Sequence, residues 1–343
     1  MILKSNKNIK ILLASAIGLA VLLLDSQTAI DGARTGLEIC LNTVLPSLFP
    51  FVFLSSFVAA SMISARIKWS YFFSRVFRIP QGAEGILMTG LLGGYPVGAK
   101  CIGEAFDDKR LTDADARRML VFCNAAGPAF IFGVTGNLFQ EAWVPWLLWL
   151  IHLCSAFCMT RLLPANSNRS VHLKECRNPS ITERLRQSVK VMSEICAWII
   201  LMRVVISFIQ KWLMWRFTEP MQVFLSGLIE LSNGCILLNQ IQNTGLRFIL
   251  CSVLLGFGGL CVALQTGTTA SSIDQRLYLP GKCVQAIISF VISYILQRFL
   301  FSIDQKIHFF WLPVLSLALL LGVFTYSSCK NKNSCGNLVC VDV

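Results

Sequence analysis

The chain alternates long uncharged runs with short segments that carry most of its charged residues. A helix that crosses a bilayer needs about 20 predominantly apolar residues. Uncharged runs near or above that length occur at residues 39–65, 119–140, 142–160, 248–273 and 307–329. The pattern therefore predicts an all-α polytopic membrane protein, with the lipid bilayer as its first expected partner.

Composition and charge agree with this class. The 343 residues are 55% hydrophobic and 14% charged, which is more apolar than a soluble domain. The formal net charge of +12 does not indicate a nucleic-acid partner, because the basic residues lie between apolar runs, as the positive-inside rule expects. Many of the fourteen cysteines lie in or beside apolar runs, which is typical of small buried hydrophobes in a reducing compartment.

Lysines precede the first apolar segment, "ILLASAIGLAVLLL". Its length would also suit a signal peptide, but no small-residue cleavage site follows in "DSQTAIDG". We expect an uncleaved helix at about residues 9–25.

Basic loops predict the topology. Residues 161–190 carry seven Lys or Arg, so we place this segment in the cytoplasm. A helix at about 36–64 returns the chain to another basic loop, and crossings at 119–140 and 142–162 then reach residues 164–190 on the same side. The stretch "GLLGGYPVGAK" at 90–100 cannot be a further complete crossing.

This stretch contains helix-breaking residues at membrane depth, which are tolerated where protein or a water-filled cavity surrounds them. Gly93, Gly94 and Pro96 are predicted to form the tip of a re-entrant hairpin. Alternatively, Gly90, Gly94 and Gly98 form a small-residue face for close helix packing. "FCNAAGPAFIFGVTG" predicts a second broken element, interrupted at Asn124, Gly127 and Pro128.

The second half repeats this order of interrupted helices. "TGLLGGYPVG" (89–98) aligns with "SGLIELSNG" (226–234), and "GPAFIFGVTG" (127–136) with "GGLCVALQTG" (258–267). The second unit would leave the cytoplasmic loop, whereas the first returns to the cytoplasm, so the repeats are predicted to be inverted. Such repeats with broken helices indicate secondary transport.

The predicted architecture has about eight transmembrane helices and two inverted repeats, each with a re-entrant hairpin and a broken helix. Its last part has a helix at about 190–213, a hairpin at about 221–241, a helix at 246–268, a loop with Arg276 and Lys282, and helices at 283–301 and 309–328. The divisions are an N-terminal helix (1–35), a first repeat (36–163), a basic cytoplasmic linker (164–190), a second repeat (191–301), and a C-terminal helix with a cytoplasmic tail (302–343).

The motifs "LPSLFPFVFLSS", "GGYPVGAK", "FCNAAGPAFIFG", "GLIELSNG" and "GFGGLCVALQ", in this order, resemble the YlbJ (SpoVV) sporulation integral membrane proteins, within the nucleoside-recognition or Gate-domain families. The resemblance covers about residues 36–300. It implies a bacterial protein that moves dipicolinic acid at the mother-cell or outer forespore membrane. Ala125, Ala126 and Ala263 depart from the more polar pattern of that family and leave the substrate open.

Half-helix N-termini suit a carboxylate, because they present unpaired N–H groups and the positive end of the helix dipole. An intramembrane ionisable residue is also a functional candidate. Arg203 and Glu230 are a substrate-binding arginine beside a proton-carrying carboxylate, a structural ion pair, or side chains that snorkel to the membrane interface. The candidate substrate-binding residues are Gly93, Gly94, Tyr95, Pro96, Gly98, Asn124, Gly127, Pro128, Arg203, Glu230, Asn233, Gly258, Gly259, Gln265 and Thr266.

Motifs for hydrolysis, ATP use or metal binding are missing from the sequence, so we expect no enzyme activity, no cofactor and no metal. The predicted function is a secondary transporter or facilitated pathway for a small organic anion. The alternatives are a structural or assembly membrane protein of sporulation and a nucleoside-like solute carrier. Both termini are expected in the cytoplasm of a bacterial cell, and a homo-oligomer is left open.

Overall fold

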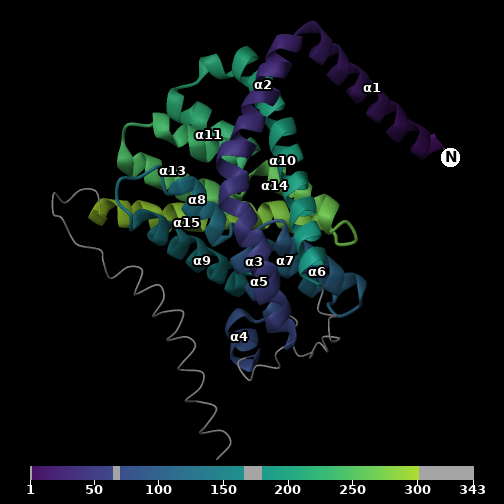
Figure 1. The fold of residues 1–343 in the computed structure, drawn as a ribbon, viewed down its shortest axis with the longest axis vertical. Coiled ribbons are helices and arrows are strands. Elements are labelled where there is room, and N and C mark those ends of the chain that lie inside the picture. Colours follow the sequence, from purple (N-terminus) through teal and green to yellow (C-terminus); the bar gives the residue numbers. More distant parts are fainter. Residues whose placement is uncertain (1, 65–69, 166–179, 301–343) are drawn as a thin grey trace, which may run out of the picture.

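A computed structural model describes residues 2–64, 70–165 and 180–300, and every regular element in these ranges is a helix (Figure 1). Six helical segments are long and apolar enough to span a membrane: Ser26–Leu54, Asp113–Thr135, Val144–Leu162, Ile181–Trp212, Thr244–Thr269 and Gln275–Leu300. They correspond to six of the eight predicted crossings. The apolar part of the first predicted helix, Ile9–Leu24, is shorter, and the crossing at 309–328 lies outside the described residues.

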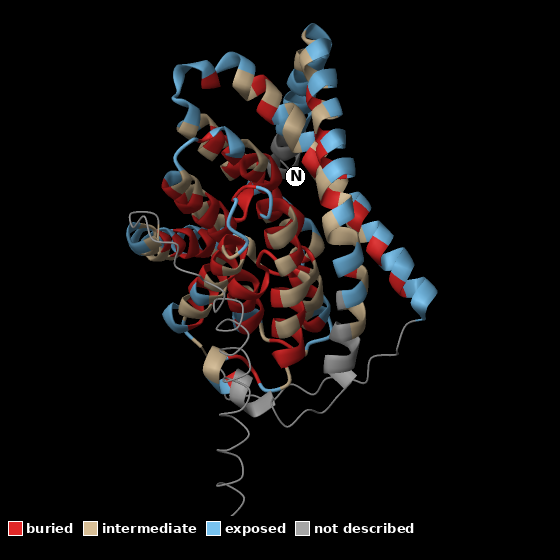
Figure 2. Ribbon diagram, turned by 60° about the vertical axis from the view of Figure 1, so that its left-hand side comes forward, coloured by how far each residue is buried: buried red, intermediate tan, exposed pale blue. Residues whose placement is uncertain are grey.

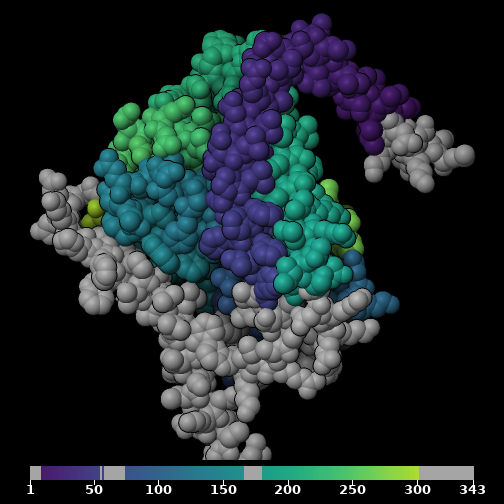
Figure 3. Space-filling model, viewed as in Figure 1, coloured from purple at the N-terminus to yellow at the C-terminus, as the bar shows by residue number. Residues whose placement is uncertain are grey.

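Two long antiparallel helical segments form one side of the molecule, one at residues 26–64 and the other at residues 181–212. Helices α1 (Ile2–Leu24) and α2 (Ser26–Ile39) meet at Asp25, and α2 continues through a π-helical turn, η1 (Cys40–Val44), into α3 (Leu45–Ser64). Helix α10 (Ile181–Trp212) begins with a capping box and packs along α2 (Figure 3). A side chain at Gly36 would come within 2.8 Å of the Ile200 backbone, so small residues permit the close packing.

The remaining elements follow the same order in both halves. The first half has α4 (Ser70–Phe77), the hairpin pair α5 (Glu84–Gly93) and α6 (Val97–Asp107), the broken pair α7 (Asp113–Cys123) and α8 (Pro128–Thr135), and α9 (Val144–Leu162). The second has η2 (Met214–Arg216), the hairpin pair α11 (Glu219–Ile229) and α12 (Leu231–Leu237), η3 (Leu238–Gln240), the broken pair α13 (Thr244–Phe257) and α14 (Gly259–Thr269), η4 (Gln275–Leu277), and α15 (Tyr278–Leu300).

An arginine near the start of each broken pair binds backbone carbonyls of neighbouring elements. Arg118 of α7 donates to the carbonyl oxygens of Arg78 and Thr160, at 2.5 and 2.7 Å. Arg247 of α13 donates to those of Leu138 and Ile241, both at 2.6 Å. Helix ends leave carbonyl groups without intrahelical partners, and these guanidinium groups satisfy several of them.

Buried residues gather where the hairpins and broken helices meet (Figure 2). The outward faces of the long helices are apolar instead, including Leu201 and Val205 on α10 and Ile287 and Val291 on α15. This distribution is that of a protein whose surrounding solvent is lipid. The ten cysteines in the described residues are free thiols.

Three predicted boundaries are wrong. The helix predicted at about 36–64 begins at Ser26, and the helix predicted at about 190 begins at Ile181. Asp25 and Ser180 cap these starts, and sequence hydropathy does not register a polar first turn as part of a span. Lys282 was predicted in a loop but lies in α15, where its side chain is fully buried.

Candidate functional site

The first hairpin tip rests on the break between α7 and α8. Gly94 ends α5 with φ of +72°, a conformation that favours glycine. A Cβ atom on Gly94 would lie 2.7 Å from the backbone nitrogen of Gly127. Gly90 and Gly98 both abut the carbonyl of Cys123, so the predicted small-residue packing face and the predicted interruption are both present.

Asn124 and His152 form hydrogen bonds at this break. Asn124 donates to Thr266 Oγ1 at 2.7 Å and to the Tyr278 hydroxyl at 3.1 Å, which ties the first break to the second half. The backbone N–H of Ala126 donates to His152 Nε2 at 3.0 Å. Sequence reasoning missed His152, because a single histidine within an apolar helix carries no motif.

The second hairpin is built around a buried carboxylate. Glu230 connects α11 to α12 and accepts from the backbone N–H groups of Ser232 and Asn233, at 2.9 and 2.7 Å, and from Asn233 Nδ2 at 3.0 Å. Glu230 is 3% exposed. Gly227 and Gly234 bring the two arms into direct backbone contact. The carboxylate therefore occupies the N-terminus of α12.

The second break lies beside both hairpin tips. Gly258 and Gly259 have φ values of +84° and +88°. A Cβ atom on Gly259 would lie 3.2 Å from the Leu231 nitrogen, at the second tip. One on Gly258 would lie 3.7 Å from the ring of Tyr95, at the first tip.

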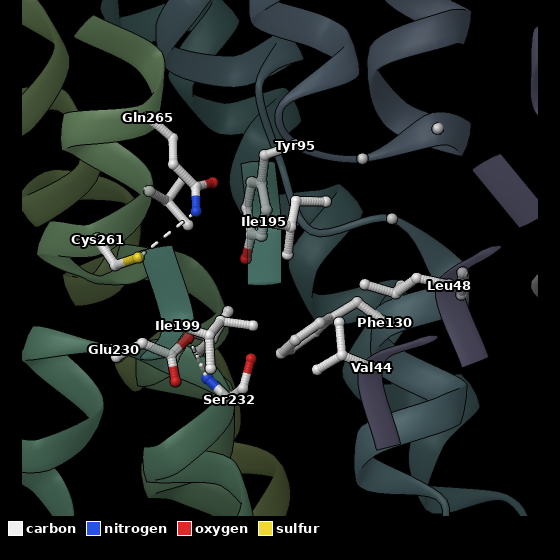
Figure 4. Close-up of a pocket in the computed structure, with 16 residues that line it drawn as sticks. Val44, Leu48, Tyr95, Phe130, Ile195, Ile199, Glu230, Ser232, Cys261 and Gln265 are labelled. Atoms are coloured by element: carbon white, nitrogen blue, oxygen red, sulfur yellow. Dashed lines mark hydrogen bonds between the residues drawn. The ribbon is translucent and has the colours of Figure 1, made fainter. Parts of the chain in front are cut away.

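These elements line a small, partly open cavity of about 30 Å³. Figure 4 shows Phe130, Val44 and Leu48 on one side, Cys261, Gln265 and Glu230 on the other, and Tyr95 between them. Helix α10 adds Ile195 and Ile199. The Tyr95 hydroxyl is buried and has no hydrogen-bond partner among the described residues.

The predicted site residues fall into two groups. Those that line the cavity are Gly93, Gly94, Tyr95, Gly127, Glu230 and Gln265. The others lie outside the lining: Pro96, Gly98, Asn124, Pro128, Arg203, Asn233, Gly258, Gly259 and Thr266. Several of the latter are structural, since Asn124 and Thr266 bind one another and Asn233 binds Glu230.

The apolar part of the lining was missed. Val44, Leu48, Ala129, Phe130, Ile195, Ile199, Leu231 and Val262 line the cavity together with Ser232 and Cys261. Apolar residues in an apolar helix carry no distinguishing signal. The spacing of Ile195, Ile199 and Arg203 offered one clue, because residues four apart share a helix face.

Arg203 and Glu230 do not form the ion pair that was one of the predictions for them. Arg203 Nη1 donates to Gln210 Oε1 at 3.1 Å, and no ion pair joins it to Glu230 in this part of the structure. Arg203 is one helical turn beyond Ile199 of the cavity lining. Its Cβ atom lies at the contact of α10 with α2, where a Cβ atom on Gly36 would come within 3.2 Å of it, and Arg203 has no carboxylate partner in the described residues.

The helix N-termini at the cavity differ in whether a side chain caps them. Glu230 occupies that of α12, whereas α8 and α14 have no side-chain cap. In α8, the N–H groups of Ala129 and Phe130 precede the first bond, from Ile131 to the Gly127 carbonyl at 3.1 Å, and have no partner among the described residues. An uncapped helix N-terminus that faces a cavity can bind an anion.

The architecture defines an integral membrane protein of the all-α, polytopic class. The chain is 24% identical to the sporulation integral membrane protein YlbJ of Bacillus subtilis (strain 168), in an alignment of 323 residues that covers 80% of this chain and 79% of that protein. No protein-family profile and no solved structure matches the chain.

Proposed function

We propose that this protein is a secondary transporter or facilitated pathway for a small organic anion, with dipicolinic acid as the first substrate to test. The observation that carries the proposal is the cavity between the two hairpin tips, where the N-termini of α8 and α14 lack side-chain caps. Similarity to a sporulation membrane protein supports a role in the membranes of a spore-forming bacterium. We infer a carrier rather than an enzyme.

The chemistry of the lining suits an aromatic dicarboxylate. Two uncapped N-termini can each accept one carboxylate group. Tyr95 and Phe130, whose ring centroids are 6.4 Å apart, can contact an aromatic ring between them. The unpartnered Tyr95 hydroxyl supplies a further donor.

The cavity holds only about two water molecules at its present size. A ring-sized substrate therefore requires the tips to separate. Matching hairpins and broken helices in the two halves support an inverted-repeat transporter, in which rocking of one repeat against the other opens the site. On this proposal, the positive charge of Arg203 attracts the anion towards the cavity.

Dipicolinate uptake into liposomes that contain the purified protein tests this function. Wild type should accumulate labelled dipicolinate above empty liposomes, and unlabelled dipicolinate should compete better than benzoate, which has one carboxylate. Better competition by a nucleoside would point to the nucleoside-like alternative. Absence of uptake by a folded protein would reject transport of this anion and favour the structural role.

Tyr95→Phe tests the site itself. The change removes a hydroxyl that makes no hydrogen bond within the described residues, so thermal stability should be unchanged. Loss of a hydrogen bond to a charged substrate costs about 1.5–3 kcal/mol, so affinity should fall roughly tenfold or more. Tyr294→Phe is the matched control, because Tyr294 lies on the exposed side of α15. Equal uptake by both variants would remove Tyr95 from the site.

A further inference from the structure

A lysine is enclosed behind the first break, outside the cavity described above. Lys282 of α15 is 0% exposed, and its ammonium nitrogen bonds to Gln285 Oε1 at 3.0 Å. Gln285 in turn donates to Ser155 of α9 at 3.3 Å. Gly281 permits this position, because a Cβ atom there would lie 2.6 Å from Val121 of α7.

The groups that face Lys282 include no carboxylate in the described residues. The titratable ones are Cys123 from α7, His152 from α9 and Tyr278 from its own helix. Where α13 packs on α15, the Ser252 hydroxyl donates to the Ser289 carbonyl. A buried ammonium with no opposite charge is strongly disfavoured unless something compensates it.

The carboxylates on the elements that pack against α15 bind other residues and not Lys282. Arg117 pairs with Asp113 and Asp274, at 2.5 and 2.8 Å. Asp115 accepts from the Thr112 hydroxyl at 2.7 Å. The other charged groups on these elements are basic: Arg118 on α7, Arg161 on α9, Arg247 on α13, Arg276 on η4 and Arg298 on α15.

Lys282 is linked to the first break through Tyr278: its ammonium nitrogen lies 5.9 Å from the centroid of the Tyr278 ring, and the Tyr278 hydroxyl accepts from Asn124 at 3.1 Å. On the same break, His152 accepts the N–H of Ala126, and the next residue, Gly127, lines the cavity. His152 Nε2 holds this bond only when it carries no proton, so His152 cannot take up a proton there without releasing Ala126. Lys282 bonds to Gln285 and not to the break, so it can bind a proton without breaking the hydrogen bonds of the break.

We propose that Lys282 is the proton-binding group that couples anion binding to proton uptake. The amine binds one proton from water and becomes an ammonium when an anion occupies the N-terminus of α8, and it returns that proton when the anion leaves. This coupling rests on the proposed function. Linkage requires the effect to be reciprocal, so protonation of Lys282 also strengthens anion binding.

The first test needs no ligand. On this proposal Lys282 carries no proton when the site is empty, so unfolding of wild type takes up a proton and stability rises with pH. The folded-to-unfolded ratio of wild type should gain up to about tenfold per pH unit over Lys282→Met, measured by thermal unfolding in detergent. Lys190→Met, an exposed lysine on α10, should follow wild type. A pH-independent difference between wild type and Lys282→Met would overturn the proposal.

Lys282→Gln provides a second variant if Lys282→Met does not fold, because glutamine retains a donor for Gln285. Calorimetry of dipicolinate binding, in buffers of different ionisation enthalpy, should then show uptake of about one proton by wild type and none by Lys282→Gln. Binding without proton uptake by wild type would reject the coupling role and leave the anion site intact. If dipicolinate does not bind, the proposed substrate fails, whereas the thermal titration still decides whether Lys282 changes its protonation.

Discussion

The N-termini of α12 and α8 face the same cavity but are completed in different ways. At α12, Glu230 supplies a carboxylate to the N–H groups of Ser232 and Asn233. At α8, Gly127 is the capping residue and has no side chain, so the corresponding N–H groups have no partner among the described residues. Both ends have the same dipole, and the difference therefore lies in whether the chain provides its own anion.

Internal similarity conceals this difference. The two halves share the order of hairpin, broken helix and long helix, but a carboxylate stands at one hairpin tip and glycine at the other. A built-in carboxylate stabilises its helix and excludes an external one. The uncapped ends are therefore where a carboxylate ligand is expected, and Glu230 is a structural cap in this conformation.

The largest expected effect comes from the backbone at the two glycine positions beside Tyr95. Gly94→Ala should destabilise the protein by about 3–5 kcal/mol, because it combines backbone strain with a clash against the Gly127 backbone. Gly258→Ala has space around its Cβ atom and should cost about 1–2 kcal/mol from the left-handed backbone. Thermal unfolding in detergent compares them, with Gly267→Ala as control because its Cβ atom would meet nothing within 4 Å. Equal losses would show that the first tip is not tightly packed.

Removing the built-in carboxylate should convert α12 into an uncapped end. Glu230→Ala should cost about 3 kcal/mol, because two buried N–H groups lose a charged acceptor. Formate at high concentration should restore part of the lost thermal stability by occupying the vacated position, and chloride at equal ionic strength should do so less. No difference between these salts would contradict the role of Glu230 as a carboxylate cap.

A double-mutant cycle between Arg203 and Glu230 should yield a coupling free energy below about 1 kcal/mol. Breaking a buried ion pair by removing one partner costs about 3–5 kcal/mol, but these two residues do not form one here. The cycle uses Arg203→Met and Glu230→Gln, singly and combined, with stability as the readout. A coupling of several kcal/mol would restore the ion-pair interpretation.

The smallest effect is expected at Asp25, which like Glu230 is a carboxylate that caps a helix. Asp25 caps α2 by accepting from the Thr28 N–H and also contacts Lys211 at 2.5 Å, and the hydrogen bond from Lys211 holds the pKa of Asp25 below its usual range. Its stabilisation is present above the unfolded-state pKa and is lost as pH falls through the lower folded-state pKa. Wild type and Asp25→Asn should therefore differ slightly in thermal stability near neutral pH and converge in acid. A constant difference would show that charge is not responsible.

Much of the architecture followed from local sequence chemistry. Long uncharged runs predict spanning helices because hydrocarbon leaves the backbone no other partner. The glycines around Gly94 and Gly258 mark interruptions, because few other residues adopt those conformations. The order of these interruptions also suggested that the second half resembles the first, and their positions agree with the four observed breaks.

Tertiary structure decided which predicted residues face the cavity. Asn124 and Thr266 looked equivalent to Gln265 in sequence, yet the first two bind one another while Gln265 lines the cavity. Lys282 appeared to belong to a loop, because hydropathy reports the polarity of a side chain and not the helix packed against it. Burial and hydrogen-bond partners depend on contacts between segments far apart in the chain, so the amino-acid sequence determined the helices and their breaks, and only packing determined which polar groups remain available.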